Sequence, residues 1–209
     1  MPESVTEIQY AEQLRTIFTL TISGEVQSWN LVEYFHPGLK KIDKRGQLNY
    51  RMFLTTLTGF DETLRKNATA ILWIEQEKLL LVGSSDFCIY VLLLGGNQEL
   101  RLKLVLASHT KCIKRMRYCP RTKYVYSVAN NNLINVWNPY VKKPITSINA
   151  FKDIDKIIID VCIPEKNNVL VGISEIGQLI VWDMLNYARV TMKYYGQKCD
   201  LTIFERKPF

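Results

Sequence analysis

The amino-acid sequence predicts an all-β fold made of repeated four-stranded units. Three observations lead to this prediction: helical periodicity is nearly absent, short runs rich in Val, Ile, Tyr and Leu alternate with polar turns, and the pattern recurs about every 45 residues. The turns carry residues that tolerate a positive φ angle, and β-prone runs joined by such turns are typical of hairpins.

The hairpins follow one another in chain order. In the first, "RTIFTLTI" is joined to "VQSWN" by "SGE"; in the second, "KLLLVG" and "DFCIYVLLL" flank the turn. The third joins "KYVYSVA" to "LINVWN", and the fourth joins "NNVLVGIS" to "QLIVWDM". Further runs precede and follow the last two hairpins, such as "CIKRMRY" and "KPITSINAF". Each period is therefore expected to hold about four short strands.

The tryptophans set the period. Trp137 and Trp182 lie 45 residues apart, and 45 residues before Trp137 stands Leu92, in a run of the same shape. Trp29 lies 63 residues before Leu92, and the surplus falls in "HPGLKKIDKRGQLNY", residues 36–50, which we expect to be an inserted loop. A repeated four-stranded unit of 40–45 residues is the signature of a β-propeller blade.

The period divides the chain into units of one domain. We expect a single propeller region over residues 1–209, with repeats at roughly 5–60, 61–108, 109–151 and 152–195, and the start of a fifth at 196–209.

The stretch "SHTKCIKRMRYCP", residues 108–120, resembles the start of a WD repeat, because its His, apolar, aromatic and Pro residues have that family's spacing. The second half of the family's pattern, a small residue, a turn Asp or Asn and a Trp-Asp pair, recurs downstream. The positions that carry the resemblance are His109, Ser127, Asn131 and Trp137 in the third unit, Trp182 and Asp183 in the fourth, Trp29 in the first and Asp86 in the second.

The resemblance implies structural roles for these residues. The family often links His, Ser, Trp and a turn Asp by hydrogen bonds within one blade. The third unit holds His109, Ser127 and Trp137 but has Asn131 in place of the Asp, and no unit has the full set. We therefore expect divergent blades that are held together mainly by packing.

The number of units bears on closure. Propellers of this family usually close with more blades than four, so we expect an open arc or a poorly closed ring. We interpret the chain as part of a larger propeller, a truncated product or gene model, or a half that another chain completes; closure by four blades alone is the remaining alternative. An open arc would expose an apolar blade face and sheet edges.

Composition favours an intracellular globular protein. Hydrophobic residues make up 47% of 209, and no apolar run has the length of a membrane span. The N-terminus lacks a secretory signal pattern, and five cysteines without a CxxC pair fit a reducing compartment. We expect a cytoplasmic location, with nuclear and cytoskeletal or ciliary locations left open.

No chemistry-bearing motif stands out. His109, Cys112 and Cys119 match no zinc-finger spacing, neither histidine belongs to a nucleophile motif, and there is no Gly-rich phosphate loop. We therefore predict no catalytic, cofactor-binding or metal-binding residues, and no enzyme.

The sequence favours a non-catalytic scaffold that mediates protein–protein interactions within a larger assembly, with a partner it does not identify. The alternative is an RNA- or anionic-surface-binding propeller that uses the net charge of +7. The basic run at residues 108–123 can be an ordinary blade strand or a contact surface. In the inserted loop, candidate contacts to an acidic partner are Lys40, Lys41, Lys44 and Arg45; an ordinary solvated loop is the other interpretation.

Overall fold

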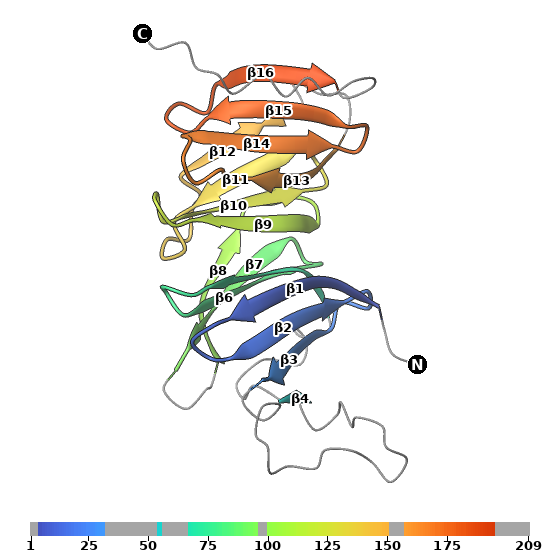
Figure 1. Ribbon diagram of the computed structural model, residues 1–209, viewed down its shortest axis with the longest axis vertical. Helices are drawn as coiled ribbons and strands as arrows, with labels where there is room; N and C mark the ends of the chain where they lie inside the picture. Colours follow the sequence, from blue (N-terminus) through green and yellow to red (C-terminus); the bar gives the residue numbers. More distant parts are fainter. Residues whose placement is uncertain (1–3, 32–53, 56–66, 96–99, 151–156, 195–209) are drawn as a thin grey trace.

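The chain folds entirely into β-strands and turns within the residues that its structure, a computed structural model, describes. These are residues 4–31, 54–55, 67–95, 100–150 and 157–194 (Figure 1). They contain strands β1 to β16 and no α-helix. The strands form four antiparallel sheets of four strands each, which confirms the predicted all-β class and its arrangement as propeller blades.

In each sheet the strands lie side by side in the order of the chain. The first sheet comprises β1 (Val5–Ala11), β2 (Thr16–Thr21), β3 (Val26–Asn30) and β4 (Leu54–Thr55). The second comprises β5 (Ala68–Ile74), β6 (Leu79–Ser84), β7 (Cys88–Leu94) and β8 (Leu100–Ala107). The third comprises β9 (Ile113–Cys119), β10 (Tyr124–Ala129), β11 (Leu133–Trp137) and β12 (Thr146–Asn149). The fourth comprises β13 (Ile158–Cys162), β14 (Val169–Ser174), β15 (Gln178–Asp183) and β16 (Arg189–Tyr194).

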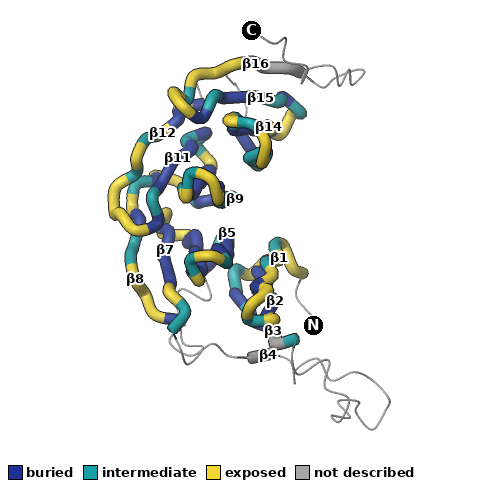
Figure 2. Tube along the Cα trace, turned by 60° about the vertical axis from the view of Figure 1, so that its left-hand side comes forward, coloured by how far each residue is buried: buried dark blue, intermediate teal, exposed yellow. Residues whose placement is uncertain are grey.

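The four sheets stack in an arc that does not close into a ring (Figure 2). The first strands of neighbouring sheets contact one another, β1 with β5, β5 with β9 and β9 with β13. In Figure 2, β5 and β9 lie on the concave side of the arc, whereas β8 and β12 lie on the convex side. The first strand of each sheet is therefore the one nearest the axis around which the sheets turn.

Turn chemistry explains the hairpins between the second and third strands. A residue with positive φ stands in each of the four: Gly24 at 82°, Phe87 at 70°, Asn132 at 54° and Gly177 at 79°. Glycine and asparagine pay the smallest steric penalty in this left-handed conformation, which explains three of the four turns, whereas Phe87 adopts it at a higher steric cost.

Three apolar cores hold the arc together, one between each pair of adjacent sheets. Successive residues of a strand point to opposite faces, so an inner sheet must be apolar on both. This explains the unbroken apolar run of β6, in which Leu79 and Leu81 face the third sheet while Leu80 and Val82 face the first.

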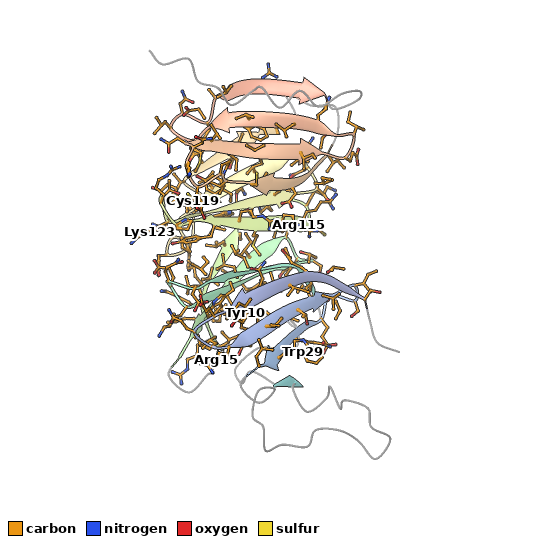
Figure 3. The ribbon with its side chains drawn as sticks, in the orientation of Figure 1. Tyr10, Arg15, Trp29, Arg115, Cys119 and Lys123 are labelled. Carbon is orange, nitrogen blue, oxygen red and sulfur yellow. The ribbon has the colours of Figure 1, made fainter. Side chains whose placement is uncertain are left out.

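The tryptophans of the third strands pack toward the preceding sheet. Trp137 is buried against the second sheet, and Trp182 is buried against the third. Trp29 holds the corresponding place in β3 and is only half-buried. It lies on the same face as Tyr10, which is 53% exposed, so the face of the first sheet that corresponds to the Trp137 face is open to solvent (Figure 3).

Candidate partner-binding cavity

The first strand of every sheet carries one extra residue near its start. The pairing register shifts between Val5 and Glu7, between Ala68 and Ala70, opposite Val128 and Ala129, and between Ile158 and Asp160. The residues that these shifts leave unpaired are Thr6, Thr69, Lys114 and Ile159, which we call the bulge residues. The last three are spaced by 45 residues, the same period as the tryptophans.

The four bulge residues line one cavity of about 530 Å³. A β-bulge bends its strand and redirects a side chain, and bulges occur often beside functional sites. The remaining wall comes from the end of β2, the start of β5, the segment that enters β9 and the turn after β10: Leu20, Thr21, Ile22, Ala68, Cys112, Ile113, Arg115 and Asn130. The cavity therefore lies where all four sheets approach the axis, at one end of their first strands.

A network of charged side chains lies beside the cavity and connects the sheets. The Arg117 guanidinium is 2.7 Å from Oδ2 of Asp160 in the fourth sheet and 4.0 Å from Oε1 of Glu7 in the first. Oε2 of Glu7 accepts a hydrogen bond of 3.0 Å from the backbone N–H of Ile71 in β5. Arg117 and the carboxylates of Glu7 and Asp160 thus join residues of all four sheets.

This arrangement buries the Glu7 carboxylate. Its side chain is only 8% exposed, and this burial raises its pKa, although the Ile71 hydrogen bond and the two nearby arginines oppose the rise. A buried carboxylate is expensive unless it is paired and hydrogen-bonded. The positive charge of Arg117 is therefore already paired with the carboxylates of Glu7 and Asp160.

The other two cations at the cavity are not balanced in this way. Among the residues that the structure describes, neither Lys114 nor Arg115 has a carboxylate within salt-bridge distance. Arg115 donates to the backbone carbonyl of Lys114 at 3.0 Å. Figure 3 shows Arg115 at the cavity end of β9, with Cys119 and Lys123 at the opposite end. Arg115 is nevertheless close enough to Glu7 to help hold down the pKa of that carboxyl, so its charge is partly balanced.

His109, Ser127 and Trp137 form a buried cluster of their own. Nε2 of His109 is 2.6 Å from Oγ of Ser127, and Nε1 of Trp137 donates to the same oxygen at 2.8 Å. His109 is 7% exposed and the other two are fully buried. Burial lowers the pKa of His109 to about 4, so the imidazole is neutral near pH 7. The cluster joins the end of the second sheet to the core of the third.

Asn131 does not join this cluster. Its side-chain amide donates to Thr110 Oγ1 at 2.9 Å, and its Oδ1 accepts from the N–H of Leu133 at 3.3 Å. In the first sheet, Nε1 of Trp29 donates to Thr19 Oγ1 at 2.9 Å. The sequence separation is ten residues, as in the Trp137 and Ser127 pair.

Asp86 and Asp183, two further positions of the predicted repeat pattern, form hydrogen bonds only to nearby residues of their own sheets among those described here. Asp86 accepts hydrogen bonds from the N–H of Cys88 and from the Tyr90 hydroxyl, within the turn and strand that follow it. Asp183 accepts from the N–H of Leu185 at 2.7 Å and shapes the turn after β15.

Trp182 has no hydroxyl partner ten residues earlier, because Gly172 stands there. A Cβ at Gly172 would lie 2.8 Å from the Trp182 ring, so the indole fills the space that a side chain would need.

Several predictions fall on parts of the chain outside the described residues. These are the inserted loop at 36–50, with Lys40, Lys41, Lys44 and Arg45, and the start of a fifth repeat at 196–209. Within the described residues, no group of three or more His, Cys, Asp or Glu side chains is placed to hold a metal ion. No helix in that part of the chain is long and apolar enough to cross a membrane.

The sequence interpretation missed the cavity. The basic run at residues 108–123 is compatible in sequence with an ordinary blade strand or with a contact surface, and neither interpretation points to a cavity. A usable signal exists in the 45-residue spacing of Thr69, Lys114 and Ile159. These residues differ in chemistry, however, and only the strand pairing shows that each one is the extra residue of a bulge.

Comparisons with known proteins support the fold. No family model matches the sequence, and no curated protein matches it. Among solved structures, a chain of the Mitotic Checkpoint Complex is similar with a TM-score of 0.66 and 14% identity, over 93% of this chain and 52% of that one. The computationally designed Ika8 protein is similar with a TM-score of 0.61 and 17% identity, over 90% of this chain and 48% of that one.

The chain therefore spans about half the length of the solved chains it matches. At these identities the likeness concerns the fold alone, and with the four meander sheets it defines a β-propeller-like architecture.

Proposed function

We propose that this chain is a non-catalytic scaffold of the WD-repeat type that binds other proteins at the axial cavity. One observation carries the proposal: all four sheets contribute their bulge residue to the same cavity. A surface built from several packed units is rigid, and rigid, extended surfaces are what repeat architectures offer to partners. The similar chain of the Mitotic Checkpoint Complex belongs to a multi-protein assembly, which agrees with this role.

The chemistry of the described residues supports binding over catalysis. His109 is neutral near pH 7, buried, and engaged with Ser127, so it cannot reach a substrate. At the cavity the hydroxyls of Thr6 and Thr69 have no neighbouring general base among the lining residues. The proposal includes the repeat boundaries predicted above and an intracellular, cytoplasmic location.

A peptide-display selection against the purified chain tests the proposal. The matched variants are Thr6→Trp, which places a bulky ring at the exposed cavity wall, and Lys166→Trp, which places the same ring on the turn at the other end of the strands. We expect selected peptides to bind Thr6→Trp at least tenfold more weakly and Lys166→Trp unchanged. Peptides that bind both variants equally well, or a selection that enriches nothing, would contradict the proposal.

The same preparation tests the nucleic-acid alternative. A protein that neutralises several phosphates loses affinity steeply between about 50 and 200 mM salt. If the chain binds an RNA pool tightly with that salt dependence, and the pool displaces the selected peptides, the alternative replaces the scaffold proposal.

A further inference from the structure

We infer that two copies of this chain associate head to tail, with the open face of the first sheet of each copy seated on the outer face of the fourth sheet of the other. The outer face is the one turned away from the third sheet. The inference concerns a second surface and does not rest on the proposed function, because the axial cavity is formed within one copy.

The first argument is that the open face of the first sheet corresponds to a face that every other sheet packs against its neighbour. Strand pairing places one row of residues across each sheet at equivalent positions. In the second sheet this row packs against the first sheet: Trp73, Leu80 and Leu92. In the third sheet it packs against the second: Tyr118, Val125 and Trp137. In the fourth sheet the row packs against the third: Leu170 and Trp182. In the first sheet no described sheet covers the row: Tyr10, Ile17 and Trp29 (Figure 3).

Exposure shows how much apolar surface this leaves open. Ile8 holds the place of Met116 and is 62% exposed, whereas Met116 is fully buried. Val5 holds the place of Ile113 and is exposed as well. Glu7 is the one charged residue of β1, β2 and β3, and it hydrogen-bonds to the second sheet on the opposite face. The open face is therefore apolar and uncharged, and exposed patches of this kind mark interaction sites.

The second argument is that the fourth sheet carries the complementary surface. The third sheet packs against the fourth with four residues of its middle strands, among others: Tyr126, Val128, Ile134 and Val136. The residues 45 positions further along hold the same places in the fourth sheet and are all aliphatic: Val171, Ile173, Leu179 and Val181. Ile173 is 39% exposed and Leu179 is half-buried, whereas the two valines are buried. Among the described elements, no sheet lies beyond this face (Figure 1).

The third argument concerns the molecule that fits the open face. Three junctions within the chain each join a face of the first kind to a face of the second kind, so the fitting occupant is a sheet of this same type. A second copy supplies one face of each kind, and two arcs joined at both ends make a closed pair with two-fold symmetry. The chain also spans 48% and 52% of the two solved chains whose fold it shares, so two copies supply about as much structure as one of those chains.

Sedimentation velocity of the full chain, over a range of concentrations, tests the inference. We expect a species with twice the mass of the 24.3 kDa chain that grows with concentration. Ile8→Lys and Ile173→Lys each place a charge on one of the two faces, and both residues are exposed in the single chain, so the fold is preserved. Each change should weaken association about tenfold or more, because it removes the burial of an isoleucine and brings an ammonium group to the junction.

The matched control is Leu102→Lys. Leu102 is 53% exposed and lies on β8, on the convex side of the arc and away from both faces (Figure 2). This change should alter association by less than about twofold. Circular dichroism of all three variants should show the same fold as the unmodified chain.

A mixture of the two face variants distinguishes head-to-tail association from pairing of identical faces. In the mixture, the unmodified fourth sheet of Ile8→Lys can meet the unmodified first sheet of Ile173→Lys. Pairs should therefore form in the mixture at concentrations at which each variant alone stays monomeric. A mixture that stays monomeric would overturn the inference.

Three other results would also overturn it: masses above two copies, an equal effect of Leu102→Lys, or an unmodified chain that stays monomeric at every concentration. The last result would assign the open face to a different molecule. If selected peptides bind such a monomer and still depend on Thr6, the head-to-tail inference fails and the scaffold proposal stands.

Discussion

Replacing Ser127 by Ala should destabilise the chain strongly, because one oxygen serves two buried groups. The Ser127 hydroxyl accepts from Trp137 Nε1 at 2.8 Å and lies 2.6 Å from His109 Nε2. Both rings are nearly inaccessible to water, so each would lose its only described partner at that nitrogen. With about 1–3 kcal/mol for each of the two unsatisfied groups, we expect a total loss of about 2–6 kcal/mol.

Thr19→Val is the matched control for this change. Thr19 stands in the same relation to Trp29, ten residues apart and 2.9 Å between Nε1 and Oγ1, but Trp29 is half-buried and water can replace the lost acceptor. We expect a loss below about 1 kcal/mol. For a chain of this size, thermal denaturation followed by circular dichroism should show a Tm decrease of roughly 4–24 °C for Ser127→Ala and below about 4 °C for Thr19→Val. Equal decreases, or no decrease for Ser127→Ala, would refute the reasoning.

Three further predictions concern pH and packing. Because the folded state lowers the pKa of His109 from 6.5 to about 4, the unfolded chain binds more protons in this window, so stability should fall as pH falls from 6.5 toward 4. Urea unfolding of a His109→Gln variant should show a smaller loss over this range, and parallel curves would contradict the assignment. Gly172→Ala should lose about 1–3 kcal/mol in urea unfolding, since the new Cβ would meet the Trp182 ring at 2.8 Å; an unchanged midpoint would show that the ring moves freely. Arg117→Met removes the cation beside Glu7 and raises the pKa of that carboxyl further, so the destabilisation should grow as pH rises from 4 to 8; a pH-independent loss would show that Arg117 acts by packing alone.

The fold could be predicted because its main signal is periodic. Trp29, Trp137 and Trp182 all occupy third strands, as the repeat spacing predicts, and the apolar runs around them coincide with sheets that are buried on both faces. Alternation of side chains in strands links such a pattern directly to structure, so one sequence is enough to find it.

The cavity could not be predicted in the same way. Lys114 lies in a run of basic residues, and nothing in the amino-acid sequence distinguishes its role from that of Arg115 or Arg117. What distinguishes them is pairing: Lys114 is the extra residue of a bulge, whereas Arg117 meets Asp160, which is 43 residues away. Bulge positions and contacts between sheets depend on three-dimensional register, which a hydrophobic pattern does not specify.

The most direct measurement of the central claim is to map where a selected peptide contacts the full chain, by amide-shift perturbation in solution. The account predicts that the largest shifts fall on the bulge residues Thr6, Thr69, Lys114 and Ile159, with little change at the turns that carry Pro120 and Pro164 at the other end of the strands. Shifts concentrated on those turns, or on the open face of the first sheet around Trp29, with the bulge residues unchanged, would contradict it.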